Sequence, residues 1–201
     1  MLLSQLQQLI DWDHRLLVWF NSFHADWLDP VMYYTSQTLF WLPLYLFLVY
    51  LMVKDFKKDW WIPLIGIALT ILLADQITAS LMKPYFARLR PSQEPALVGI
   101  IHLVRDHNGE IYTGGLYGFA SSHAANTFGT ATFFTLLLRD KHAWIKWLFL
   151  WAACMTYTRI YLGVHYPGDI LVGTAVGVTS AFVGFKIFGW LNLKYAARTS
   201  L

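Results

Sequence analysis

The sequence predicts an all-α membrane protein: a multi-pass transmembrane helix bundle of about five spans, preceded by an amphipathic helix at the interface. Composition is the first reason. Hydrophobic residues make up 57% of the 201-residue chain, charged residues only 13%, and the mean hydropathy is +0.44. That balance is too apolar for an ordinary soluble domain. The second reason is that the apolar residues form continuous runs, close to the roughly 20 helical residues that cross a bilayer core.

The N-terminal segment, residues 1–28, is too polar to span a membrane. Asp11, Asp13, His14 and Arg15 alternate there with Leu, Ile and Trp. This mixture favours an amphipathic helix that lies in the plane of the interface.

Five apolar runs are then expected to cross the membrane, at residues 30–53, 60–82, 122–138, 144–158 and 169–190. The third and fourth are short for spanning helices, so we expect them to extend into their polar flanks. No repeat or linker divides the chain, which predicts a single integral-membrane domain over residues 1–201.

The basic residues predict the orientation of the bundle. Loops rich in Lys and Arg stay in the cytoplasm. If the loop at 54–59 is cytoplasmic, nine of the fifteen basic residues share that side. The long loop at 83–121 and the turn at 159–168 then face outward. Within the long loop, Asn108-Gly109 is typical of a hairpin turn.

Two features limit the other classes of function. Cys154 is the single cysteine, so no disulfide framework exists. The formal net charge of +3 is not gathered into one basic block. No nucleic-acid partner is therefore expected.

Three polar clusters fall on the predicted outer side. Their residues are Lys83 and Arg90 after the second span, Ser121, Ser122 and His123 at the start of the third, and Arg159, His165 and Asp169 between the fourth and fifth. A single charge at a membrane end is usually an anchor. Three clusters with two histidines on one side favour a functional site.

Phosphoryl transfer is the chemistry that needs this set of groups. Lysine and arginine side chains hold phosphate oxygens, and backbone N–H groups at a helix start favour anions. One histidine can attack phosphorus while the other protonates the departing oxygen. A carboxylate such as Asp169 orients the attacking imidazole. Since side chains supply the cations and no cluster of metal-binding carboxylates accompanies them, neither a metal nor another cofactor is expected.

The order and spacing of these residues resemble a known signature. Lys83-x6-Arg90-Pro91, Ser121-Ser122-His123 and Arg159-x5-His165-x3-Asp169 look like the three motifs of the type 2 phosphatidic acid phosphatase superfamily. That superfamily includes lipid phosphatases, bacterial acid phosphatases and vanadium haloperoxidases. The resemblance implies a role for each site residue: His165 as the nucleophile that forms a phosphohistidine, Asp169 as its partner, His123 as the general acid, and Lys83, Arg90, Ser121, Ser122 and Arg159 as phosphate ligands.

Two positions depart from the usual motifs. The middle motif commonly reads Pro-Ser-Gly-His, whereas this chain has Ala120-Ser121-Ser122-His123. The third motif commonly begins Ser-Arg, and here Thr158 precedes Arg159. Both changes keep the acids, bases and cations, so we expect them to affect rate or substrate preference rather than the reaction.

Two polar residues inside the spans have no place in the motifs. Asp75 lies eight residues before Lys83, about 12 Å along a helix. That distance is too long for contact with the reacting atoms, which favours an interhelical hydrogen bond and leaves support of the site as the alternative. For Asn126, one turn into the third span, a structural hydrogen bond is expected.

The predicted function is a membrane-embedded lipid phosphatase at the outer face of a bacterial cytoplasmic (inner) membrane, with the site facing the periplasm. Membrane lipids and a lipid phosphate are its expected partners. The substrates left open are undecaprenyl diphosphate, phosphatidylglycerophosphate, phosphatidic acid and lipid A phosphate. A lipid phosphotransferase of the same fold is the main alternative, and a non-enzymatic scaffold or transporter is a weaker one. The sequence does not fix the oligomeric state.

Overall fold

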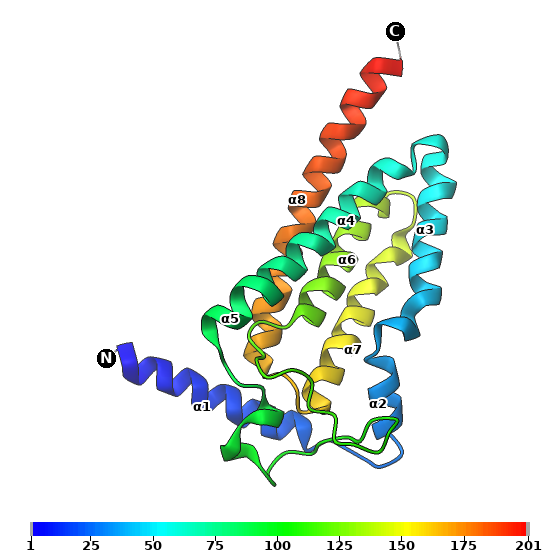
Figure 1. The fold of residues 1–201 in the computed structure, drawn as a ribbon. Helices are drawn as coiled ribbons and strands as arrows, with labels where there is room; N and C mark the ends of the chain where they lie inside the picture. Colours follow the sequence, from blue (N-terminus) through cyan, green and yellow to red (C-terminus); the bar gives the residue numbers. More distant parts are fainter. Residues whose placement is uncertain (1, 200–201) are drawn as a thin grey trace.

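The protein is a bundle of helices with a long loop and two further helices at one end (Figure 1). The computed structural model describes residues 2–199. The α-helices are α1 (Leu2–Asn21), α2 (Asp29–Thr35), α3 (Leu42–Phe56), α4 (Trp61–Asp75), α5 (Lys83–Phe86), α6 (Ser122–Leu138), α7 (Leu148–Tyr161) and α8 (Pro167–Thr199). Within this range two isolated bridges are the sole β pairings. The all-α membrane bundle predicted from the sequence is confirmed.

Short helical segments continue several of these helices. They are η1 (Thr38–Trp41), η2 (Lys57–Asp59), the π-helical η3 (Gln76–Met82), η4 (Pro91–Gln93), η5 (Pro95–Leu97) and η6 (Ala143–Trp147). With them, three stretches are long and apolar enough to cross a membrane: Thr38–Asp59, Trp61–Phe86 and Pro167–Tyr195. The helices α6 and α7 are shorter, at 17 and 14 residues.

The first predicted span, residues 30–53, is broken in the structure. Helix α2 ends at Thr35, and a new helical segment starts at Thr38 and leads into α3. Pro43 lies in the first turn of α3. Proline has no N–H to continue a preceding helix, so it separates η1 from α3. The break after α2 comes earlier, at Gln37, whose backbone is extended. The span therefore begins near Thr38, and α2 belongs to the end of the bundle.

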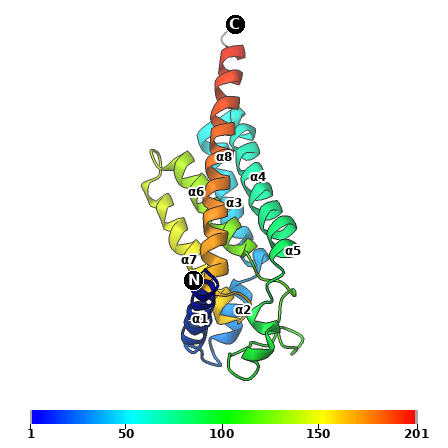
Figure 2. The same cartoon turned by 90° about the vertical axis from the view of Figure 1, so that its left-hand side faces the viewer.

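Helix α1 lies across that same end, outside the bundle (Figures 1 and 2). Leu9, Trp12 and Trp19 are exposed on it, while Leu17 is fully buried, as suits an interfacial helix. The helix is shorter than the predicted 1–28 and stops at Asn21. The Asn21 amide donates to the carbonyls of His102, Ile160 and Tyr161, so it fixes the end of α1 to the end of α7.

Helix α8 runs the length of the bundle, with α4 on one side and α6 on the other (Figure 2). Glycine makes this close packing possible. A Cβ atom at Gly177 would overlap the carbonyl of Ala125 in α6, and one at Gly184 would overlap Thr70 in α4. Close backbone approach of this kind is a common way for helices to associate in a membrane. It fixes the start of α8 beside the start of α6, where the polar residues gather.

Candidate active site

The three polar clusters converge at one end of the bundle, where α6 begins and α7 leads into α8. The backbone N–H of Ser121 donates to the Asp169 carbonyl over 3.0 Å, which joins the second cluster to the third. The Lys83 ammonium donates to the Ser122 hydroxyl over 3.0 Å, which joins the first to the second. In this way residues that are up to 86 positions apart in the sequence form one site.

His165 and Asp169 form the buried centre of the site. Helix α8 starts at Pro167, so Asp169 falls in its first turn. Its Oδ2 accepts the N–H of Tyr166 over 3.0 Å and lies 3.2 Å from His165 Nδ1. A carboxylate that reaches back to the N-terminal backbone is favoured at a helix start. The contact with Nδ1 leaves Nε2 as the nitrogen available for attack.

The surroundings of His165 keep its imidazole neutral. The side chain is 1% exposed. Burial, together with the charges of Arg90, Arg159 and Lys83, lowers the pKa of His165 well below its usual value of 6.5. Burial and nearby cations both disfavour a charged imidazolium. At neutral pH Nε2 therefore carries the lone pair that a nucleophile needs.

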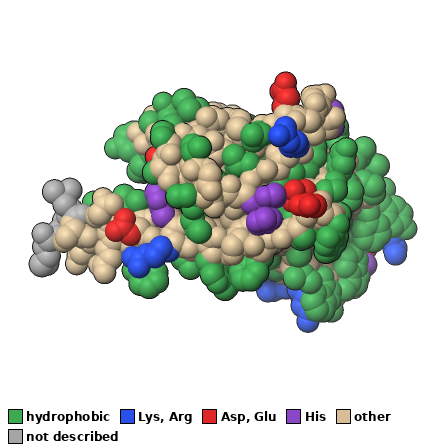
Figure 3. Space-filling view, turned by 90° about the horizontal axis from the view of Figure 1, so that it is seen from below, with side chains coloured by type: hydrophobic (Ala, Val, Ile, Leu, Met, Phe, Trp, Pro, Cys, Tyr) green, Lys and Arg blue, Asp and Glu red, His purple; other side chains and the backbone are tan. Residues whose placement is uncertain are grey.

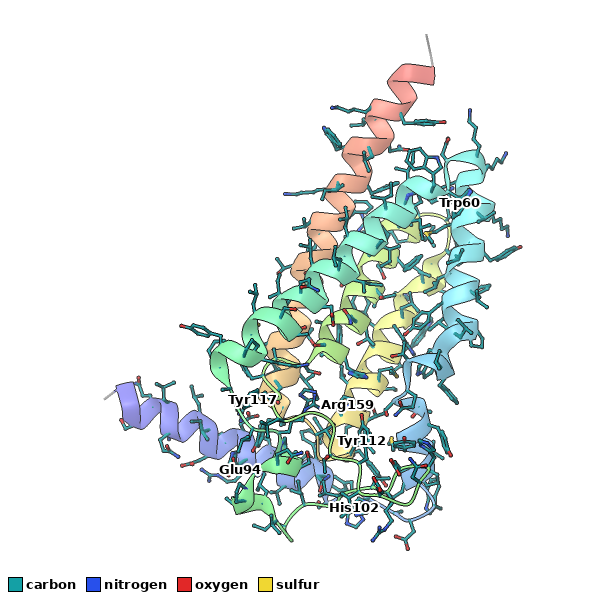
Figure 4. The ribbon with its side chains drawn as sticks, in the orientation of Figure 1. Trp60, Glu94, His102, Tyr112, Tyr117 and Arg159 are labelled. Carbon is teal, nitrogen blue, oxygen red and sulfur yellow. The ribbon has the colours of Figure 1, made fainter. Side chains whose placement is uncertain are left out.

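Two buried arginines bring unpaired donors to the same place. Arg90 donates from Nε to the Tyr117 carbonyl over 3.2 Å, yet its Nη1 has no partner. Arg159 donates from Nη2 to the Tyr112 hydroxyl over 3.1 Å, and its Nε and Nη1 have none. Figure 4 shows Arg159 at the end of α7, with Tyr112 and Tyr117 of the loop nearby. Buried cationic donors are costly unless an anion meets them.

The two serines of the second cluster have their side chains engaged by the protein. Ser121 is the N-cap of α6, and its hydroxyl accepts the N–H of Ala124 over 3.4 Å. Ser122 accepts from Lys83 and lies 2.9 Å from the Thr78 hydroxyl. The first backbone N–H groups of α6, at Ser122 and His123, have no acceptor inside the helix. These N–H groups are suited to bind an anion. Ser122, which stands where the motif commonly has glycine, holds the Lys83 ammonium through its hydroxyl.

His123 belongs to the same electrostatic cluster. It interacts with the charges of Arg159, Arg90 and Lys83 and with His165. The site thus holds one imidazole bound to a carboxylate and a second imidazole beside the cations. The described residues place no three His, Cys, Asp or Glu side chains together in a way that could hold a metal ion.

Arg88 and Asp13 belong to the site although the sequence did not single them out. Arg88 donates to Asp169 Oδ1 over 3.0 Å and to Asp13 Oδ2 over 2.8 Å. Asp13, in α1, also accepts the N–H of Gly168 over 2.7 Å. The guanidinium of Arg88 covers the ring of Tyr166, 3.9 Å from its centroid. The interfacial helix is therefore connected to Asp169 through a single arginine.

The long loop between α5 and α6 also forms part of the site. Its predicted hairpin pairs Arg105 with Ile111 and leads into the segment that carries Tyr112. Further along, Gly118 packs against the centre itself. A Cβ atom there would lie 2.9 Å from Asp169 Oδ2 and 3.6 Å from His165 Nδ1. In the sequence, only the several glycines of this loop could have indicated that its backbone approaches other residues closely.

Comparison with known proteins gives consistent matches. Residues 60–193 match the family model described as the PAP2 superfamily. The chain is 39% identical to the lipid A 4'-phosphatase of Bacteroides thetaiotaomicron over an alignment of 191 residues. This alignment covers 92% of this chain and 77% of that protein. It is 31% identical over 202 residues to the lipid A 4'-phosphatase of Porphyromonas gingivalis, covering 97% of this chain and 83% of that one. The crystal structure of Aquifex aeolicus LpxE aligns with a TM-score of 0.64 and 26% identity, over 86% of this chain and 93% of that one.

Gly118 provides a specific test of this geometry. Gly118→Ala places a methyl group against Asp169 and displaces it from His165. We expect initial rates of phosphate release from a lipid phosphate to fall roughly tenfold to a hundredfold, since small displacements of catalytic groups have large effects on rate. Gly115→Ala is the matched control, because its Cβ meets nothing closer than Arg90 Nη2 at 4.0 Å. Equal rates for the two variants, at equal thermal stability in detergent, would show that Gly118 does not constrain the centre.

Proposed function

Because this chain belongs to the PAP2 superfamily and is a phosphatase that acts on lipid phosphate, we propose that it removes the 4'-phosphate of lipid A. In this proposal a phosphohistidine forms on His165, and the reaction takes place at the periplasmic face of the inner membrane.

One observation carries the proposal. The residues Arg90 and Arg159 are 8% and 2% exposed, and the guanidinium groups of both have donors without a partner among the described residues. They surround an imidazole whose nucleophilic nitrogen is free. Planar, permanently charged arginine side chains are well suited to phosphate oxygens. A phosphoryl group bound by them would lie beside His165, where it can be attacked.

In the first step, Nε2 of His165 attacks phosphorus and the bond from phosphorus to the leaving oxygen breaks. Asp169, on Nδ1, stabilises the positive charge that develops on the ring. The negative charge of the bound phosphoryl group offsets the cations beside His123, so that its imidazole is protonated in the complex with substrate. It gives this proton to the leaving oxygen, which departs as an alcohol. Arg90, Arg159, Lys83 and the first N–H groups of α6 stabilise the charge on the phosphoryl oxygens.

In the second step, water replaces the alcohol. His123, now neutral, takes a proton from the water as the oxygen attacks the phosphohistidine. The bond between phosphorus and Nε2 breaks and inorganic phosphate leaves. The protein's own side chains supply every cation and proton transfer in both steps, so the proposal requires no cofactor.

The position of the site and the known relatives support lipid A as substrate. The site lies at the end of an apolar bundle, where a phosphorylated head group can enter while acyl chains stay in the lipid. Figure 3 shows that hydrophobic and uncharged side chains cover most of this end, and that charged side chains are scattered. Two relatives that each cover more than nine tenths of the chain are lipid A 4'-phosphatases. They favour lipid A over phosphatidic acid, phosphatidylglycerophosphate or undecaprenyl diphosphate.

The covalent intermediate tests the roles of the two histidines. With a ³²P-labelled aryl phosphate, whose leaving group needs little protonation, His123→Ala should form the phosphoenzyme and hydrolyse it slowly, so that label accumulates. His165→Ala should retain no label. The bond should be stable in alkali and labile in acid, as a phosphoramidate is. His107→Ala is the control, since this exposed loop histidine contacts Tyr33 and none of the proposed catalytic or phosphate-binding residues.

Label bound to His165→Ala would place the nucleophile elsewhere and contradict the mechanism. In wild type, label should finish in inorganic phosphate. Label on a second lipid would assign the chain to the phosphotransferases instead.

The proposed sidedness follows from the basic residues and can be tested by labelling. In a Cys154→Ala background, a cysteine at His107 should react with an impermeant thiol reagent added to intact cells. A cysteine at Lys57 should react only after the membrane is opened. Both positions are exposed. The loop between η5 and α6, which carries His107, lies at the opposite end of the bundle from η2, which carries Lys57. The reverse pattern would place the site in the cytoplasm and remove the case for a periplasmic substrate.

A further inference from the structure

A cavity of about 410 Å³ extends from His123 into the bundle. It lies between α3, α4, α6 and α7. Its lining residues are Thr38, Tyr45, Ile71, Asp75, Ser122, His123, Asn126, Thr127, Thr130 and Met155. Most of these side chains carry a polar group, and polar residues inside a membrane bundle often mark a binding site or a pathway.

The contact with His123 suggests what this cavity holds. In the proposed function, on which this inference rests, His123 protonates the leaving oxygen. The leaving group must therefore extend from the phosphoryl site on the His123 side. A larger cavity, of about 740 Å³, lies between α1 and the start of α8, but neither His123 nor His165 lines it. The cavity beside His123 is thus the better place for the part of the substrate that departs.

Two acceptors in this cavity have no protein donor. Asn126 makes no hydrogen bond with other described residues, and its Oδ1 is buried. The structural hydrogen bond expected for it is therefore wrong. Asp75 interacts electrostatically with Lys83, but its carboxylate forms neither a hydrogen bond nor an ion pair within residues 2–199. The interhelical hydrogen bond expected for Asp75 is wrong as well.

The backbone at Asp75 is also irregular. Helix α4 ends there and the π-helical segment Gln76–Met82 begins. Such segments are rare and often occur at functional sites. A carboxylate inside a span is costly without a partner, and most such residues mark a binding site or a pathway.

The missing partners must be donors, and this requirement discriminates among lipids. An ionised carboxylate and an amide oxygen only accept hydrogen bonds. Diacylglycerol, released from phosphatidic acid, presents ester oxygens and no donor beyond the new hydroxyl. Undecaprenyl phosphate, released from the diphosphate, presents an anionic phosphate and an apolar chain. Phosphatidylglycerol, released from phosphatidylglycerophosphate, adds a single further hydroxyl. A sugar ring carries several hydroxyl groups, and an acylated amino sugar carries an amide N–H as well.

We propose that the cavity beside His123 binds the sugar ring of the leaving group, and that Asp75 and Asn126 accept hydrogen bonds from its hydroxyl and amide groups. Deeper in the bundle, a second cavity of about 280 Å³ shares Tyr45, Ile71 and Thr130 with the first. Its other lining residues are apolar. A chain attached to the sugar can continue into it, between α3 and α4.

The test compares two substrates across three variants. Asp75→Leu and Asn126→Leu remove the acceptors at nearly constant size. On lipid A, we expect kcat/KM to fall roughly tenfold to a hundredfold for each variant, as for lost hydrogen bonds to charged or buried groups. On phosphatidic acid, which has no sugar, kcat/KM should stay within about threefold of wild type. Gln76→Leu is the control, because this neighbouring polar residue is exposed and does not line the cavity.

The inhibition constant for vanadate is measured on each preparation, and it should not change if the phosphoryl site is intact. The inference is overturned if the two variants cleave lipid A as fast as Gln76→Leu does. It is also overturned if kcat/KM of the two variants falls by the same factor on lipid A and on phosphatidic acid. Failure of the wild type to cleave lipid A while it cleaves phosphatidic acid would instead refute the proposed substrate, and the sugar site with it.

Discussion

The hydrogen bond between Asp169 and His165 is the interaction on which the rest of the site depends. It exists because α8 starts at Pro167, which puts the carboxylate in the first turn, within 3.2 Å of Nδ1. Each neighbouring element then fixes Asp169 further. Arg88 holds its other oxygen, Gly118 leaves room for it, and the N–H of Ser121 binds its carbonyl. A buried, neutral imidazole with Nε2 free is the result.

The membrane setting explains why the polar groups are so concentrated. Inside a bilayer an unpaired polar group is expensive, and the helices α4, α6 and α8 are packed closely enough for glycine to be needed at their contacts. Near the site, the described residues include unsatisfied donors on Arg90 and Arg159 and, just inside the bundle, unsatisfied acceptors on Asp75 and Asn126. Donors suit a phosphoryl group, and acceptors suit hydroxyl groups. The two sets meet at His123.

The sequence was sufficient to predict the all-α bundle, because long apolar runs have few other stable structures in a membrane. It also predicted that the proposed catalytic residues lie together, because their spacing places them at helix starts and turns. It could not show that Asp13 of α1 reaches Arg88, since that contact spans 75 positions and depends on how α1 lies across the bundle. Nor could it show that the first span is interrupted after Thr35. The hydrogen bonds expected for Asp75 and Asn126 failed for the same reason, because partners between helices depend on packing and not on pattern.

The most direct test of the central claim, that His165 is the nucleophile within a phosphate-binding cluster, is a crystal structure of the protein with vanadate. Vanadate takes up the geometry of a phosphoryl group under attack. The account predicts vanadium bonded to His165 Nε2, with its oxygens facing Nη1 of Arg90 and Nε and Nη1 of Arg159, and with His123 next to the oxygen opposite the nitrogen. Vanadate bound elsewhere, or held by the arginines with Nε2 of His165 pointing away from vanadium, would contradict it.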